Sequence, residues 1–251
     1  MPRRRHDDAA KHLFSFGMWI LISTAVAFLG TQADRLILGK LISFELLGIY
    51  GIALAIAYIP SQVIGALSSK VIFPAVSKLA HLPRETLRTK ILQHRRLFLV
   101  GSALILIVLV SFGDILILAL YDQRYTQAAW MLPILALGIW PNLLAETVRQ
   151  SLVAIGKPSY QAYAQLLKSI YICIGLPLAF SLIGIVGAVI VVALNDLPVY
   201  AVITYGLCRE GLACIRQDIQ ATVLLFALLT LVLMGRAILG LGLPIREIFA
   251  F

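Results

Sequence analysis

Polar side chains recur at helical spacing inside stretches of the chain that are otherwise apolar. Two trios share the spacing i, i+4 and i+7, namely Asn142, Glu146 and Arg149, and Gln161, Gln165 and Lys168. Residues with this spacing lie on one face of a helix, so each trio predicts a polar stripe. Asp34 and Arg35 form a further charged group at the end of the first apolar stretch.

The basic residues in these groups have chemistry that suits an anion. The planar guanidinium of arginine makes paired, charge-assisted hydrogen bonds with phosphate. A charged side chain inside a membrane is costly, and by default it faces the interior of a helix bundle or a watery cavity. We therefore predict a polar cavity that binds a phosphate or another anion, with these substrate-binding residues: Asp34, Arg35, Asn142, Glu146, Arg149, Gln165 and Lys168.

The same residues also have a structural interpretation, which the sequence leaves open. Glu146 and Arg149 would satisfy each other within one helix, and Lys168 would extend its ammonium to the membrane surface. Asn195 and Asp196 precede a proline in an otherwise apolar run. They would either face the same cavity or satisfy the backbone carbonyl that the proline leaves without a donor.

No constellation typical of catalysis is visible. Four histidines lie in charged segments, with no nucleophile or carboxylate at catalytic or metal-ligand spacing: His6, His12, His81 and His94. The three cysteines lack C-x-x-C spacing. The chain also lacks the G-x-x-x-x-G-K-[ST] phosphate loop, so an ATP-driven motor within it is not expected. We expect no enzymatic activity, no metal site and no cofactor.

The composition indicates which elements carry these residues. Apolar residues make up 61% of the 251 and charged residues 13%, against about 45–50% and about 25% in soluble domains. A helix of about 20 apolar residues crosses a bilayer. The chain is therefore predicted to be an all-α, polytopic integral membrane protein with about seven transmembrane helices. Breakers and charges place these spans at residues 13–33, 46–67, 97–121, 126–155, 160–181, 185–207 and 219–243.

Three features of these spans bear on the fold. The fifth and sixth spans are joined by little more than Leu182, Ile183 and Gly184, which predicts a tight turn. Asp114 lies near the outer end of the third span and is expected to reach lipid headgroups. The chain thus divides into a basic N-terminal segment over residues 1–12, a six-helix unit over 13–207, and an additional helix with a short tail over 208–251.

The basic excess has a topological explanation. Of the 21 Lys and Arg residues, 16 fall on the connections of one side of the predicted spans and 5 on the other. Cytoplasmic loops carry such an excess. This asymmetry predicts a multi-pass protein of the cytoplasmic membrane with its N-terminus in the cytoplasm. Anionic lipid surfaces account for the cations, so a nucleic-acid partner is not expected.

Five short motifs, in the same order along the chain, resemble the polysaccharide transporter (oligosaccharide flippase) family of the multidrug/oligosaccharidyl-lipid/polysaccharide exporters. They are Gln32-Ala33-Asp34-Arg35-Leu36-Ile37-Leu38-Gly39, Leu47-Gly48-Ile49-Tyr50, Ile72-Phe73-Pro74-Ala75-Val76-Ser77-Lys78-Leu79, Ala154-Ile155-Gly156-Lys157-Pro158 and Ile183-Gly184-Ile185-Val186-Gly187-Ala188. The resemblance is to the second half of a full-length member. It implies one half of a two-lobed bundle around a central cavity.

The resemblance also implies a function. Members of that family flip lipid-linked oligosaccharides between leaflets, and a basic cavity would meet the diphosphate of the carrier lipid; the motif itself supplies Arg35. A half-length chain would need a second half-transporter or a second copy of itself. The alternatives are a truncated remnant, or a non-transporting scaffold that recruits glycosyltransferases through a basic loop from Lys70 to Arg96. A membrane-embedded glycan-transferring enzyme is the third alternative.

Overall fold

The computed structural model describes residues 32–79 and 82–240, and the regular structure among them is helical. A helical segment over residues 32–41 is followed by α2 (Phe44–Leu67), the π-helix η1 (Ser68–Ile72), α3 (Phe73–Leu79), α4 (Arg84–Leu120), the short η2 (Gln123–Tyr125), α5 (Thr126–Gly138), α6 (Trp140–Ala154), α7 (Ser159–Ala193), the short η3 (Leu194–Asp196), α8 (Leu197–Arg209) and α9 (Ile215–Ile238). The predicted all-α class is confirmed. The basic segment 1–12, nearly all of the first span and the tail 241–251 lie outside the described residues.

Five helical stretches of the described chain are long and apolar enough to cross a membrane. One of them, Ser159–Arg209, has 51 residues, which would extend about 77 Å as a straight helix, more than twice the hydrocarbon thickness. It reverses at Gly184, whose φ of 66° and ψ of −145° are accessible almost only to glycine. The tight turn predicted between the fifth and sixth spans is thus confirmed.

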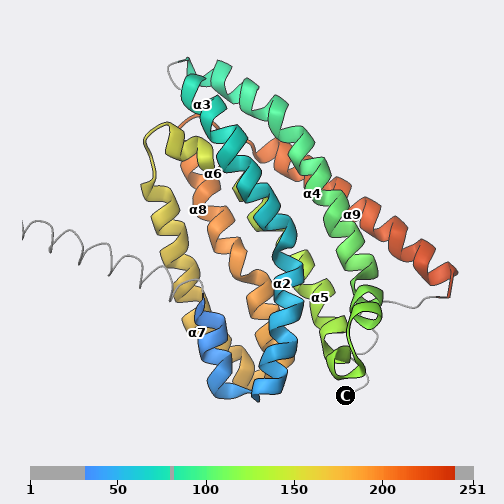
Figure 1. Ribbon diagram of the computed structural model, residues 1–251. Helices are drawn as coiled ribbons and strands as arrows, with labels where there is room; N and C mark the ends of the chain where they lie inside the picture. Colours follow the sequence, from blue (N-terminus) through green and yellow to red (C-terminus); the bar gives the residue numbers. More distant parts are fainter. Residues whose placement is uncertain (1–31, 80–81, 241–251) are drawn as a thin grey trace, which may run out of the picture.

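The two arms of this hairpin return along each other in close contact. A Cβ added to Gly187 would lie 2.4 Å from the backbone oxygen of Ala179, and one added to Gly206 would meet the ring of Tyr160 at 2.8 Å. Glycine at both positions allows the arms to approach. Figure 1 shows α7 and α8 running side by side, so the 51-residue stretch contains two crossings.

The centre of the bundle is α5, in which residues 128–133 are all buried. A helix that is apolar and buried on every side belongs in the core, and α5 packs against α2, α4 and α7. The helix stops at Gly138, where an added Cβ would lie 2.3 Å from the backbone oxygen of Ala193. Pro141, in the first turn of α6, lacks the N–H that a continuous helix requires. The fourth predicted span is therefore two helices.

Ion pairs join α4 and α9 at both ends. Arg95 and Asp218 approach to 2.6 Å, and a guanidinium nitrogen of Arg236 donates to Asp114 Oδ1 at 2.8 Å. At 1.5 Å per residue, Arg95 and Asp114 are about 28 Å apart along α4. Their partners Asp218 and Arg236 are about 27 Å apart along α9. The order of charge is opposite on the two helices, so this pairing fixes a parallel arrangement in register. A reversed α9 would bring Arg236 next to Arg95.

The interpretation of Asp114 as a headgroup contact was wrong. Its side chain is paired with Arg236, which is itself 3% exposed, and Arg236 also donates to the carbonyl of Ser111. Sequence spacing within α4 gives no sign of this partner, because it lies 122 residues further along the chain.

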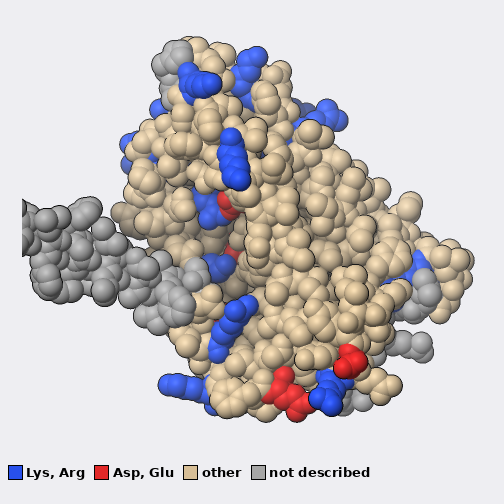
Figure 2. Space-filling model, in the orientation of Figure 1, with Lys and Arg blue, Asp and Glu red and all other residues tan. Residues whose placement is uncertain are grey.

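The basic end of the molecule is helical. α4 has 37 residues, about 56 Å, and exceeds the hydrocarbon thickness by nearly half its length. The basic stretch from Lys70 to Arg96, expected as a loop, forms η1, α3 and the start of α4, apart from a short connection. Figure 2 shows Lys and Arg gathered at this end, whereas charges of both signs lie at the opposite end.

Candidate functional site

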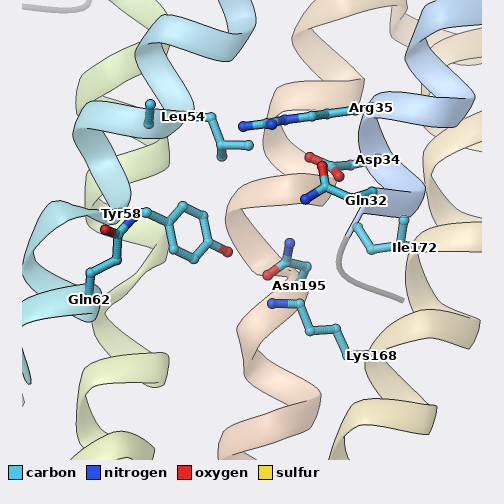
Figure 3. A pocket seen from close by; sticks show the side chains of 10 residues that line it. Gln32, Asp34, Arg35, Leu54, Tyr58, Gln62, Lys168, Ile172 and Asn195 are labelled. Carbon is cyan, nitrogen blue, oxygen red and sulfur yellow. The ribbon is translucent and has the colours of Figure 1, made fainter. Parts of the chain in front are cut away.

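A polar pocket of about 230 Å³ lies between the segment 32–41, α2, α7 and η3. The charged and polar residues that line it are Gln32, Asp34, Arg35, Tyr58, Gln62, Lys168 and Asn195. Figure 3 shows Tyr58 and Gln62 on the α2 side, with Asn195 and Lys168 across the pocket and Arg35 extending toward α2. Leu54, Ala55 and Ile172 supply the apolar part of the wall.

A buried ion pair lies at the inner wall of this pocket. Lys168 Nζ donates to Asp196 Oδ1 at 2.6 Å, and the two side chains are 14% and 1% exposed. Tyr58 donates its hydroxyl to Asp196 Oδ2 at 3.3 Å, and its ring lies 5.9 Å from Lys168 Nζ. Lys168 is nine residues inside α7, roughly 14 Å from its first residue. Its ammonium is therefore held deep in the bundle by a carboxylate, instead of reaching a membrane surface.

The second carboxylate of the pocket is also engaged. Asp34 accepts a hydrogen bond of 2.6 Å from the Tyr50 hydroxyl, and both residues are buried. Arg35, by contrast, is exposed and makes no ion pair within the described part of the chain. Asp34 and Arg35 are consecutive but point differently, because neighbours on a helix are separated by about 100°. Arg35 thus offers the pocket a guanidinium that no ion pair with the described residues engages.

Asn195 adds a polar atom without a partner. Its Oδ1 is buried and accepts no hydrogen bond from the described residues, and Figure 3 shows its amide beside Lys168 and opposite Tyr58. The 3₁₀ turn η3 places Asn195 and Asp196 here, since Pro198 at the start of α8 interrupts the regular helix. Buried polar atoms are nearly always hydrogen-bonded, so this amide is a position for a bound group or water.

The stripe on α6 faces α2 and does not line this pocket. Asn142 accepts from Ser61 Oγ at 3.2 Å, and the backbone oxygen of Glu146 accepts from Ser68 Oγ at 2.8 Å. Glu146 and Arg149 form an ion pair. This pairing agrees with the structural interpretation of these two residues, although Nε of Arg149 is buried without a hydrogen-bond acceptor in the described chain.

The structure therefore gathers part of the predicted set. Asp34, Arg35 and Lys168 share the pocket. Asn142 and the backbone of Glu146 instead accept hydrogen bonds from serines of α2 and η1, and Arg149 is paired with Glu146. Gln165 is half-buried on α7 without lining the pocket. In Figure 2 the hollow of this face contains basic atoms with acidic atoms next to them.

Sequence reasoning missed several members of the site. Tyr58 and Gln62 come from α2, where nothing in an apolar run distinguishes a pocket tyrosine from a packed one. The polar pair Asn195 and Asp196 before a proline is a signal that the sequence does carry, but the sequence does not identify their partners. Outside the pocket, Arg95 is 1% exposed and paired with Asp218, whereas the sequence predicts a cation of a basic loop.

The arrangement suits the binding of a small anionic group. Arg35 supplies a bidentate donor, Lys168 an ammonium, and Tyr58 and Asn195 hydrogen-bonding groups. The residues that the structure describes contain no cluster of three or more His, Cys, Asp or Glu placed to hold a metal ion. The pocket that the described residues form, at about 230 Å³, is smaller than the roughly 300–1,000 Å³ of typical small-molecule sites, so it has room for a phosphate or a single sugar unit and not for an oligosaccharide.

Comparison with known proteins gives a consistent family assignment. Residues 2–130, just over half of the chain, match the model of a family described as "Polysaccharide biosynthesis protein". The chain is 33% identical to the teichuronic acid biosynthesis protein TuaB of Bacillus subtilis (strain 168) over 127 residues, which are 51% of this chain and 26% of TuaB. It is 25% identical to the amylovoran biosynthesis protein AmsL of Erwinia amylovora over 122 residues, 49% of this chain and 31% of AmsL. The matches thus span about a quarter to a third of these relatives. No solved structure matches the chain significantly.

Proposed function

Because the chain belongs to the family of polysaccharide biosynthesis proteins, we propose that it is a flippase-like half-transporter that moves a lipid-linked oligosaccharide across the cytoplasmic membrane. The observation that carries the proposal is the polar pocket around Arg35 and Lys168 inside an otherwise apolar bundle. Its size and charge fit the phosphate end of such a lipid. Of the predicted residues, those through which it would act are the three that line the pocket, Asp34, Arg35 and Lys168.

The charged side chains of the pocket support the transport proposal, because placing a charge within a membrane is energetically unfavourable. The Lys168–Asp196 pair and Arg35 lie in a bundle whose outer surface is apolar, including exposed Leu104, Val108 and Leu231. Such charges mark ion or substrate paths by default. In the proposed cycle the anionic headgroup occupies the pocket while the lipid tail stays in the bilayer, and the protein alternates between states open to either side.

The small pocket also leads us to propose a partner. A glycan of several sugars needs a cavity wider than the pocket that the described residues form, so a second half would face α2 and α7 across this pocket. A separate half-transporter or a second copy of the chain would supply it. A single cysteine at Gln62, which lines the pocket, should cross-link to such a partner. A single cysteine at Lys40, which is exposed and outside the pocket, should not.

The decisive assay reconstitutes the purified protein in liposomes with a fluorescent lipid-linked oligosaccharide, alone and with a co-encoded half. An impermeant quencher added outside measures how fast the probe changes leaflet. Arg35→Gln and Lys168→Gln should each slow this movement about 10-fold or more, because a hydrogen bond to a charged group contributes about 1.5–3 kcal/mol. Arg124→Gln, which removes an exposed arginine outside the pocket, should leave the rate unchanged.

A further variant separates binding from folding. Lys168→Gln leaves Asp196 charged and buried, which by itself destabilises the bundle. Lys168→Met combined with Asp196→Leu removes both charges, and it should restore thermal stability without restoring transport. The transport proposal is refuted if the probe does not move under any of these conditions. If, in addition, the protein retains glycosyltransferases and this retention depends on the exposed cations between Lys70 and Arg96, the scaffold alternative is favoured.

The orientation is part of the proposal. We place the N-terminus and the basic end of α4 in the cytoplasm, following the charge asymmetry. A single cysteine at Lys157 should then resist an impermeant maleimide in intact cells, whereas one at Gln123 should react. The reverse result would invert the topology.

A further inference from the structure

A second cavity lies on a different face of the molecule, between the first half of α4 and the start of α9. This groove has a volume of about 960 Å³, and none of the residues that line it lines the polar pocket. Three exposed arginines surround its outer end: Arg88, Arg96 and Arg216. The transport site uses none of them.

The charges of the groove are unbalanced. Arg88 donates its Nε to the carbonyl of Ala213 at 2.7 Å, which orients the guanidinium and engages only one of its nitrogens. Arg96 and Arg216 make no ion pair and no side-chain hydrogen bond with the described residues. Glu85 is the one acidic side chain in the lining, so three positive charges face one negative charge.

The groove becomes apolar toward the middle of the membrane. On α4, Arg88 and Arg96 are followed by Val100 and Ala103, and on α9 the order from the N-terminal end is Arg216, Gln220, Leu224. From Arg88 to Ala103 the lining extends about 22 Å along the helix axis. A positive end, a short amide zone and an apolar channel match the phosphate, ester and acyl parts of a phospholipid in that order.

The floor of the groove is rigid. Gln217 donates to the carbonyl of Leu92 at 3.0 Å and accepts from Arg95 at 3.5 Å. Arg95, 1% exposed, is paired with Asp218 behind it. These contacts join α4 to α9, so the separation of the two helices, and with it the width of the groove, is fixed without a ligand.

We propose that this groove binds one anionic phospholipid, with the phosphate at the three arginines and an acyl chain along Leu99, Ala103 and Leu224. Basic pockets between membrane helices recognise anionic headgroups. A free phosphate would leave the apolar half of the groove without an occupant, which is why the proposal names a lipid. The site is independent of the proposed transport, because it lies on other helices and holds a resident lipid instead of a cargo.

Native mass spectrometry of the full chain in detergent tests the proposal. The protein is titrated with phosphatidylglycerol, with phosphatidylethanolamine, and with phosphatidylglycerol in the presence of millimolar inorganic phosphate. Arg96→Gln combined with Arg216→Gln should weaken phosphatidylglycerol binding about 25-fold, at about fivefold for each arginine near a membrane surface. Lys90→Gln is the matched control, since Lys90 is exposed on the same turn region of α4 but lines the cavity beside α3.

The outcomes separate the possible sources of the signal. Tight binding of one phosphatidylglycerol that the double variant loses and Lys90→Gln retains supports the site. Unchanged affinity in the double variant, an equal loss in Lys90→Gln, or equally tight binding of phosphatidylethanolamine overturns it. Displacement of the lipid by inorganic phosphate would show that a free anion is sufficient, and would also overturn the assignment. Melting temperatures of both variants verify that the fold is retained, since neither changes a buried side chain.

Discussion

The Arg95–Asp218 pair gives the sharpest test of what holds this bundle together. Arg95 donates Nε to Thr147 Oγ1 at 2.7 Å and Nη2 to the carbonyl of Leu144 at 2.7 Å, and Asp218 also accepts from Tyr200 at 3.0 Å. The pair therefore connects α4, α6, α8 and α9. Asp218→Asn keeps the size of the side chain and most of the hydrogen bonds but leaves the arginine charge buried without its counter-ion.

Removing one member of a buried pair costs about 3–5 kcal/mol. We expect the lower figure here, because Thr147, Leu144 and Gln217 still accept from Arg95. At about 2–4 °C per kcal/mol for a protein of this size, Tm should fall by about 6–12 °C. Arg95→Met combined with Asp218→Leu removes both charges, and should recover at least half of the loss, since an apolar pair of similar volume is often as stable as the ion pair.

Tryptophan fluorescence during heating in detergent micelles measures this directly. Trp140 is a local reporter, because its Nε1 donates to Thr222 Oγ1 at 2.9 Å and that hydroxyl donates to the carbonyl of Asp218 at 2.8 Å. Asp122→Asn, at an exposed position, is the control and should leave Tm unchanged. A Tm for Asp218→Asn within 1–2 °C of the parent, or a double variant no more stable than the single one, would refute the reasoning.

Three further outcomes follow from local geometry. Gly138→Ala should cost about 1–3 kcal/mol, because the new Cβ would lie 2.3 Å from the backbone of Ala193. Gly101→Ala, inside α4, meets nothing within 4 Å and should leave Tm unchanged or raise it in the same melting assay, because alanine favours a helix more than glycine does. Gly184→Ala should cost about 1–3 kcal/mol of strain at φ 66°; a wild-type Tm would contradict the glycine-specific turn. Cys214 is 2% exposed, and burial raises the pKa of its thiol. In a variant with the other two cysteines changed to serine, Cys214 should therefore react with maleimide at pH 8 far more slowly than a free cysteine. Labelling of the folded protein at the rate of free cysteine would contradict this.

The sequence predicts those features of the fold that depend on residues close to one another along the chain. The apolar composition determines the class, and Gly184 and Pro141 mark a reversal and a helix break through their own backbone requirements. These effects act within a few residues of the one that causes them. Local reasoning is sufficient for them.

The candidate site depends on contacts that local reasoning does not reach. The stripe with Lys168 was visible, but helical spacing says that one face is polar and not which helix lies opposite, so Asp196 and Tyr58 were not assigned to it. Arg95 was misplaced for a related reason. The helix that carries it begins at Arg84, well before the apolar run, and therefore extends the packed surface of α4 beyond the hydrocarbon.

The two ion pairs between α4 and α9 have a consequence for biosynthesis. Arg236 leaves the ribosome 122 residues after Asp114, and at about 5–20 residues per second this is an interval of roughly 6–24 seconds. Until Asp218 is synthesised, 18 residues before Arg236, the nascent α4 has both Arg95 and Asp114 but neither counter-ion. We therefore expect α4 to complete its packing only after α9 has been inserted, because α9 carries the counter-ions of both charges.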